Sequence, residues 1–306
     1  MKKSILYILV VVILSACGDT EATRQRLDRQ QRLEQQRQDS LALKIAVLPT
    51  LDGLPLFLAH EHRMFDTLGV DVRLRQYNAQ MDCDTAFRGT TVEGIVSDLV
   101  RTERFQQQGI GLKYVAGTVQ HWQLIASKRS RVSRLDQLGD KVVGITRFSG
   151  TDWLTNQCLE GVKVKGDVYR VQINDVLIRL RMLIGNEIDA AWLSEPWATL
   201  ARQRGGVVLV DSSDRYPVLG VIAFKDEAIR DKRRQKQLSL FLKGYNMACD
   251  SLNAHGLSAY VDVLKKYYRI DDKTIAALPK IRYMHAVEPT ADNIKKVSAF
   301  VKTTIN

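Results

Sequence analysis

The sequence predicts an α/β protein with two mainly parallel sheets, each flanked by helices, and a helical tail at the C-terminus. Three observations support this fold class. Short apolar segments of strand length alternate with amphipathic segments of helical length from residue 43 to about residue 225, as is typical of parallel sheets covered by helices. The alternation runs through two successive series, and only helical patterns follow from Asp226 onwards. We therefore expect two lobes separated by a cleft.

The first series runs from residue 43 to residue 127. Its apolar runs predict strands over 43–48, 70–77, 93–96, 112–119 and 122–127. Its amphipathic stretches predict helices over 55–64 and 99–105. Pro55 suits the first turn of the earlier helix, because the first helical position needs no N–H donor.

The second series begins near residue 133. It predicts strands over 141–146, 168–172, 188–193 and 207–210, with helices over 150–159, 176–184 and 196–204. A last strand over 218–224 and helices over 238–253, 258–267 and 293–301 complete the chain.

The first seventeen residues have the features of an export signal. Lys2 and Lys3 precede an apolar run over 5–14 that is short for a permanent membrane span. The run ends in Leu14-Ser15-Ala16-Cys17, which resembles the bacterial lipobox. This implies that residues 1–17 form a lipoprotein signal peptide in which Cys17 is the lipidated residue. The chain would then be anchored to a membrane, facing the periplasm or the cell exterior. An ordinary cleaved signal or an uncleaved anchor is the alternative.

Residues 18–42 are rich in Gln and Arg and have few strongly apolar positions. Such a segment cannot build a core, so we expect a tether or solvated helix that separates the domain from the membrane. A short coiled coil that binds a partner is the alternative.

Charge and cysteine content exclude some kinds of site. The formal net charge is +11, but the Lys and Arg residues are scattered, so we expect a basic, solvated surface and no nucleic-acid partner. Beyond Cys17, the three cysteines Cys83, Cys158 and Cys249 allow at most one disulfide. Their spacing matches no metal-binding pattern, so we expect free thiols and no metal.

Ligands of open α/β sheets bind beyond the carboxyl ends of the strands. The residues that follow the predicted strands are therefore the ligand-binding candidates: Asp52, Leu54, Asp98, Gln120, Trp122, Ser149, Gly150, Thr151, Trp153, Asn174 and Glu195. Helix capping is the plain structural interpretation of several of them.

Segment 146–153 carries the strongest local signal. A strand leads into Ser149-Gly150-Thr151, where a helix begins, so hydroxyls, backbone N–H groups and the helix dipole can bind an anionic or polar group. Glu195 could accept hydrogen bonds from an amine or amide, while Trp122 and Trp153 could pack on an apolar part of a solute.

Three stretches resemble the solute-binding proteins for nitrate, sulfonates, taurine and thiamine-precursor pyrimidines: GTTVEGIVSDLVR (89–101), LDQLGDKVVGITRFSGTDW (135–153) and LIGNEIDAAWLSEPWA (183–198). In the third stretch, Gly185, Ile188-Asp189-Ala190 and Glu195-Pro196 match the family pattern, whereas Glu93 and Phe148 depart from it elsewhere. The resemblance covers roughly residues 43–300 and implies the type II periplasmic-binding-protein fold.

The resemblance also implies how the chain is divided and what it does. Lobe 1 would consist of residues 43–127 and 217–306, and lobe 2 of residues 128–216, with hinges near Ser127 and Pro217. The protein would be a monomer without a cofactor that closes over a small polar or anionic solute. It would deliver this solute to the permease and ATPase subunits of an ABC importer. The sequence does not choose between a sulfonate-, taurine- or nitrate-like anion and a pyrimidine.

Two other functions remain open. A sensory or structural lipoprotein would bind a solute without delivering it, and the sequence does not separate this function from transport. An enzyme of thiamine-pyrimidine synthesis on the same fold would need a positioned base or nucleophile. We expect no enzyme, because the five His residues are scattered and the Cys-rich motif of that branch is missing.

Overall fold

The computed structural model describes the backbone of residues 2–304 and, except at residue 22, the side chains of residues 21–303. The N-terminal helix α1 (Lys2–Leu41) belongs to one compact unit, and a second unit begins at Leu43. Leu27 and Leu33 of α1 are more than half exposed, as in a solvated helix. The expected lipidation of Cys17 lies outside the described side chains. Within the described part of the chain, no helix is long and apolar enough to cross a membrane.

The first sheet has the strand order β2-β1-β3-β10-β4. Its strands are β1 (Leu43–Val47), β2 (Val72–Gln76), β3 (Gly94–Asp98), β4 (Leu112–Gly117) and β10 (Gly220–Lys225). β1 pairs in parallel with β2 and β3, whereas β10 lies antiparallel between β3 and β4. The sheet is therefore mixed, and only the late strand β10 runs against the direction of the other described strands.

The second sheet repeats this design in the order β7-β6-β8-β5-β9. Its strands are β5 (Gln123–Ala126), β6 (Lys141–Ile145), β7 (Val168–Gln172), β8 (Ala190–Leu193) and β9 (Val207–Asp211). β6 pairs in parallel with β7 and β8, and β5 lies antiparallel between β8 and β9.

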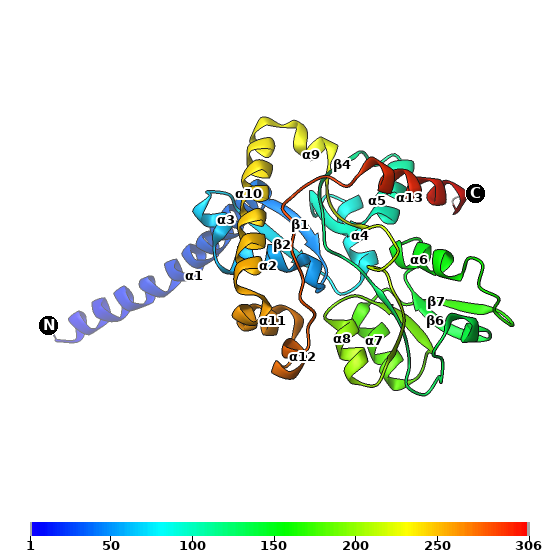
Figure 1. Ribbon diagram of the computed structural model, residues 1–306. Coiled ribbons are helices and arrows are strands. Elements are labelled where there is room, and N and C mark those ends of the chain that lie inside the picture. The colour runs from blue at the N-terminus through cyan, green and yellow to red at the C-terminus, as the bar shows by residue number, and fades with distance from the viewer. Residues whose placement is uncertain (1, 305–306) are drawn as a thin grey trace. The chain divides into compact units, whose positions relative to one another are not determined.

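Helices surround both sheets (Figure 1). Those before the return strand β10 are α2 (Leu54–Glu61), α3 (Met64–Thr67), α4 (Gln80–Arg88), α5 (Leu99–Gln107), α6 (Gly150–Leu159), α7 (Val176–Gly185) and α8 (Trp197–Gln203). Those after it are α9 (Asp226–Arg230), α10 (Lys232–His255), α11 (Val261–Tyr268), α12 (Asp272–Ala276) and α13 (Ala291–Thr304). Short 3-10 turns occur at Leu51–Gly53, Leu135–Leu138 and Leu257–Tyr260.

Both faces of each sheet are buried. In β1, Ile45 belongs to a core that includes residues of α2 and α10, whereas Ala46 belongs to a core with residues of α4 and α5. In β8, Leu193 shares a core with residues of α7 and α8, whereas Trp192 shares one with residues of α6. A sheet covered on both faces needs apolar side chains at successive positions, which explains the continuous apolar runs of these strands.

The predicted fold class is confirmed, with three corrections of detail. β5 belongs to the second sheet, because it pairs with β8 and β9; the sequence prediction had left residues up to 127 in lobe 1. Helix α4 was not predicted. The tail is mostly helical, but its longest connecting stretch, residues 278–290, adopts no helix.

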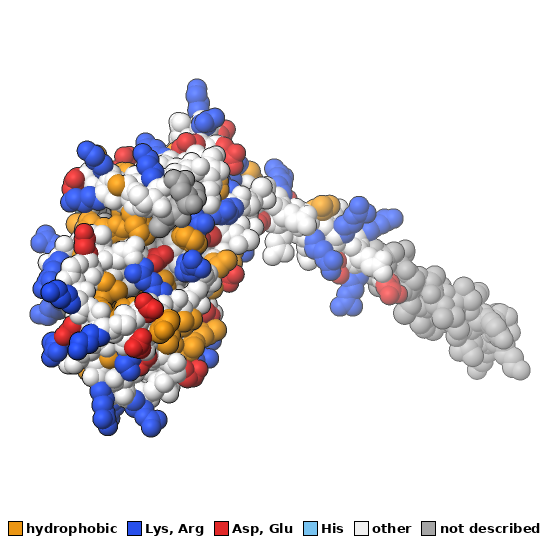
Figure 2. Space-filling model, turned by 90° about the vertical axis from the view of Figure 1, so that its right-hand side faces the viewer, with side chains coloured by type: hydrophobic (Ala, Val, Ile, Leu, Met, Phe, Trp, Pro, Cys, Tyr) orange, Lys and Arg blue, Asp and Glu red, His pale blue; other side chains and the backbone are white. Residues whose placement is uncertain are grey.

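The side chains agree with two expectations drawn from composition. Cys83, Cys158 and Cys249 are free and buried. On the face seen in Figure 2, the Lys and Arg side chains are spread over the surface instead of gathering in one patch.

Candidate functional site

A small cavity lies between the carboxyl ends of the two sheets. Its volume is about 30 Å³, which is room for about two water molecules if each needs roughly 10–15 Å³. Much of its lining comes from the loops after β1 and β3 of the first sheet and after β6, β7 and β8 of the second. This is the position at which open α/β sheets bind ligands.

On one side of the cavity, the loop before α4 contacts the loop before α7. Segment 78–80 pairs with segment 174–176 around an isolated antiparallel bridge between Ala79 and Asp175. Two backbone hydrogen bonds of 3.3 and 3.5 Å flank this bridge. The two sheets are therefore joined directly at this point.

On another side, the loop after β1 contacts the loop after β8. Leu51 N donates to Glu195 O at 2.9 Å, and Trp197 Nε1 donates to Pro49 O at 2.9 Å. The peptide bond between Glu195 and Pro196 is cis. With these contacts on both sides, the structure shows the two sheets in a closed arrangement.

The start of α6 faces the cavity because two hydroxyls shape the turn before it. Ser149 Oγ accepts a hydrogen bond from Thr151 N at 3.2 Å, and Thr151 Oγ1 accepts one from Thr146 N at 3.0 Å. The first N–H of the helix, Gly150 N, donates to Asp98 Oδ1 at 2.9 Å. A carboxyl group from the first sheet therefore occupies the helix N-terminus, where negative charge is stabilised.

Asp98 is buried and also caps α5, since its Oδ1 accepts from Arg101 N at 3.1 Å. Burial raises the pKa of the Asp98 carboxyl to about 7, although the hydrogen bonds from the backbone N–H groups of Arg101 and Gly150 act to lower it. At neutral pH this carboxyl therefore exists in both protonation states, and protonation removes one negative charge from the cavity wall.

Arg179 of α7 places a cation at the cavity. Its guanidinium is buried and donates to Ile173 O at 2.9 Å, to Trp192 O at 3.0 Å and to the hydroxyl of Thr146. Among the described residues, no carboxylate lies within ion-pair distance of it. Burial lowers the pKa of Arg179 to about 10, with Asp175 acting in the opposite direction, so the group stays charged at neutral pH. Carbonyls and a hydroxyl orient this charge without neutralising it.

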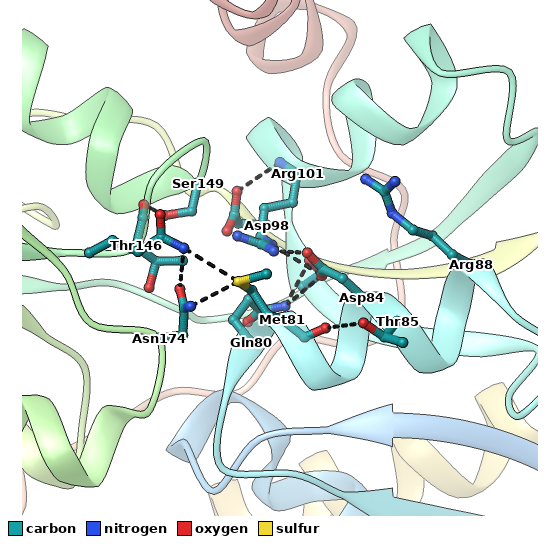
Figure 3. A network of polar contacts seen from close by, with 12 residues as sticks. Gln80, Met81, Asp84, Thr85, Arg88, Asp98, Arg101, Thr146, Ser149 and Asn174 are labelled. Carbon is teal, nitrogen blue, oxygen red and sulfur yellow. Dashed lines mark hydrogen bonds and ion pairs between the residues drawn. The ribbon is translucent and has the colours of Figure 1, made fainter.

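A buried ion pair supports the opposite wall (Figure 3). Arg101 of α5 pairs with Asp84 of α4, with Nε 3.1 Å from Oδ1. Gln80 Nε2 lies 3.4 Å from Asp84 Oδ1 and 3.4 Å from Ser97 Oγ. Burial lowers the pKa of Arg101 to about 9. The pair therefore fixes Gln80, whose side chain lines the cavity.

The structure gathers some of the sequence-predicted site residues around the cavity and places others elsewhere. The candidates that line it are Asp98, Gln120, Trp122, Ser149, Thr151 and Asn174. Gly150 reaches it through its N–H bond to Asp98. A Cβ at Gly150 would come within 3.1 Å of the Trp122 ring, so the helix start and this indole are in close contact.

Four candidates do not line the cavity. Leu54 and Trp153 are buried in the apolar cores, and Trp153 packs edge-to-face on Tyr216 with 6.1 Å between ring centroids. The carboxylate of Glu195 accepts from Thr199 N at 3.0 Å and from Arg202 Nη2 at 2.9 Å. Glu195 therefore lies before α8, binds the N–H of Thr199 in its first turn and pairs with Arg202 near its end.

Asp52 is the fourth of these candidates. It is buried in the turn after β1, where its Oδ2 lies 3.4 Å from Thr118 Oγ1 and its Oδ1 has no hydrogen-bond partner. Burial raises the pKa of this carboxyl, against hydrogen bonds from Thr50 and Thr118. The raised pKa favours the neutral form of this carboxyl, which argues against Asp52 as a charged ligand-binding group.

The ligand-binding candidates named from the sequence left out several cavity residues: Leu48, Thr50, Gln80, Thr146, Val176, Arg179 and Ser194. One signal could have identified Arg179. It follows Val176 by three residues and precedes Leu183 by four, which places an arginine on the apolar face of α7.

Comparison with known proteins gives similarities of structure alone. No family model and no curated protein sequence matches the chain. The alkanesulfonate-binding protein of Xanthomonas axonopodis pv. citri, solved with bound MOPS, has a TM-score of 0.72 and 14% identity, covering 86% of this chain and 92% of that one. The ligand-binding component of an ABC-type import system from Staphylococcus aureus, solved with zinc bound, gives 0.70 and 17%, with the same coverage.

The periplasmic nitrate-binding protein of Synechocystis gives a TM-score of 0.67 and 12% identity over 86% of this chain and 80% of that one. At such identities the likeness establishes the fold. The chain has the type II periplasmic-binding-protein fold, in the form seen in sulfonate- and nitrate-binding proteins.

Proposed function

We propose that this protein is the solute-binding component of an ABC importer and that it captures a small oxyanion, of the sulfonate or nitrate kind, in the cavity between its sheets. The observation that carries the proposal is the buried Arg179 guanidinium, which faces the cavity without a carboxylate partner. The fold supports the transport role, and relatives of that fold bind an alkanesulfonate, MOPS or nitrate.

The anion would take the position of the Asp98 carboxyl at the start of α6. In the closed structure, Gly150 N already donates to a carboxyl oxygen, so the helix end is preorganised for an oxyanion. The nearby hydroxyls of Thr146 and Ser149 add donors, and the charge of Arg179 compensates the charge of the solute. Because the cavity is small, the two sheets must separate to admit the solute and close again over it.

The cavity favours an anion over a flat pyrimidine. Trp153 and Trp192 are packed in the apolar cores and cannot stack on a ring in the cavity. Trp122 is the tryptophan that lines it. The charged guanidinium is costly to bury without a counter-charge, and a neutral ring would not supply one.

Delivery to a permease and attachment to the envelope through Cys17 complete the proposal. Attachment rests on the Leu14-Ser15-Ala16-Cys17 motif. A lipid-anchored binding protein of this kind would face the periplasm or the cell exterior and act as a monomer.

Titration of the purified chain with nitrate, methanesulfonate, taurine and the thiamine pyrimidine tests the proposal by calorimetry and thermal unfolding. At 100 times the dissociation constant, a ligand stabilises the fold by about 2.7 kcal/mol. We expect one of the anions to bind and the pyrimidine not to bind. Binding of none of the anions, or of the pyrimidine alone, would contradict the proposed solute class.

Variants at Arg179 test the observation that carries the proposal. Arg179→Met removes the buried charge and should lower anion affinity at least tenfold, whereas Arg179→Lys retains the charge and should lower it less. Arg170→Met is the matched control, because Arg170 lies on β7 and pairs with Asp152 outside the cavity. Circular dichroism verifies that each variant is folded. Equal anion affinity in Arg179→Met and in the control would exclude Arg179 from the site.

A further inference from the structure

A second hollow, of about 430 Å³, lies beside the contact between the two sheets. It is lined on the side of the second sheet by Arg181 of α7 and Trp197 of α8, and on the side of the first by Asn78 and the end of α11. The two backbone bonds between segments 78–80 and 174–176 and the bond from Trp197 Nε1 to Pro49 O lie next to it, and it shares no lining residue with the inner cavity. It is therefore a distinct site.

The charge of this hollow is of one sign. Arg181, Lys266 and Arg269 line it, and none of its lining residues is acidic. Lys266 is paired with Glu61 at 2.7 Å. The exposed side chains of Arg181 and Arg269 have no ion pair or hydrogen bond within the described structure. Two uncompensated guanidinium groups therefore face one concave surface.

Helix electrostatics account for part of this arrangement only. Lys266 and Arg269 lie at the C-terminus of α11, where the helix dipole favours cations. Arg181 has no such reason to be there, because it comes from the second turn of α7 on the other side of the contact between the sheets. Like charges on one concave surface repel one another weakly in water, and an anion between them would replace this repulsion with attraction.

We propose that this hollow is a second anion site that takes a divalent oxyanion carrying a phosphate-like group and bridges Arg181 to Arg269. Guanidinium groups suit such a ligand, because their planar N–H forks bind phosphate oxygens in pairs. A bridging anion contacts both sheets when they are closed and only one when they are apart. It therefore stabilises the closed arrangement, independently of the solute in the inner cavity.

Calorimetric titration of the purified full chain with inorganic phosphate, at constant ionic strength set with sodium chloride, tests this site. We expect Arg181→Gln and Arg269→Gln each to reduce the phosphate affinity of the outer site at least tenfold. Arg129→Gln is the matched control, because Arg129 is an exposed arginine in the turn after β5 and lies outside the hollow. It should leave the affinity unchanged.

Three results would overturn the inference. The wild-type isotherm could coincide with that of the Arg181→Gln/Arg269→Gln double variant, which shows that no phosphate binds in the hollow. Arg129→Gln could lose as much affinity as the others, which shows general charge screening. Only one of the two substitutions, at Arg181 or at Arg269, could lower the phosphate affinity, which excludes an anion that bridges both. The double variant keeps the inner cavity intact, so its titration with nitrate and methanesulfonate reports separately on the proposed function.

Discussion

Asp98 connects the two sheets through the hydrogen bonds that its carboxyl accepts. Its carboxyl oxygen accepts hydrogen bonds from Arg101 N at the start of α5 and from Gly150 N at the start of α6. The first bond lies within the first sheet's own elements, whereas the second crosses the cavity. In the closed structure the protein thus places its own carboxyl where an anionic solute is proposed to bind.

The raised pKa of Asp98 gives a defined dependence of stability on pH. Because burial raises the folded-state pKa from 3.8 to about 7, the folded protein binds the proton more tightly than the unfolded chain. This contribution to stability is complete below about pH 4 and is lost as the pH rises through about 7.

Asp98→Asn removes this titration while keeping an oxygen that accepts from Gly150 N. One pKa unit is worth about 1.4 kcal/mol, so the stability of the variant relative to wild type should increase by about 2–3 kcal/mol between pH 5 and pH 8. Urea unfolding at the two pH values measures the difference. If the stability difference between the variant and wild type is the same at pH 5 and at pH 8, the pKa of Asp98 is not raised.

At the scale of elements, the helices and strands that could be predicted are those whose own sequence carries the signal for them. The bounds of α6 and β7 agree with the sequence prediction, because Ser149 marks the N-cap of α6 and Val168–Gln172 is rich in β-branched and aromatic residues. Helix α4 escaped prediction since its sequence, QMDCDTAFR, has few apolar positions. Gln80 of the cavity was missed along with it.

The candidate site was less predictable than the elements, because it depends on how separate elements meet. The rule that ligands bind beyond strand ends found Asp98 and Thr151. It did not distinguish them from Glu195, which follows β8 but pairs with Arg202 of the next helix, α8. Arg179 lies within a helix, away from any strand end, and became a cavity residue only through the packing of α7 on β6 and β8.

The ion pair between α4 and α5 is the clearest test of packing between elements. Arg101→Met should destabilise the protein by about 3–5 kcal/mol, because it leaves the Asp84 carboxylate buried without a cationic partner. The double variant Asp84→Leu/Arg101→Met buries no charge and should recover much of this loss. Urea unfolding of the single and the double variant measures the loss of stability and its recovery. A single variant as stable as wild type would show that Asp84 reaches solvent or is neutral.

At the scale of the whole molecule, closure depends on contacts between loops and helices of the two sheets. The bridge between Ala79 and Asp175, the two bonds from the loops after β1 and β8, and the bond from Gly150 to Asp98 join the sheets around the cavity. A solute larger than the cavity's two or so waters needs these contacts to break. The contacts of Met81 with Gln172 and Asn174, and the packing of Arg104 over the Phe148 ring, also join the sheets and must break as well.

A disulfide between positions 79 and 175 should lock the closed arrangement. Ala79 and Asp175 form the non-hydrogen-bonded kind of antiparallel pair, with Cα atoms typically about 4.5 Å apart, which suits a disulfide. In oxidised Ala79→Cys/Asp175→Cys, we expect anion exchange to stop and amide hydrogen exchange of segment 146–152 to slow, and reduction should restore both. Asp175→Cys alone is the control, because losing the cap that Asp175 provides to α7 costs about 1 kcal/mol by itself. If the disulfide forms only in denaturant, or if the oxidised protein exchanges anion as fast as the reduced one, solute entry does not require the sheets to separate at this contact.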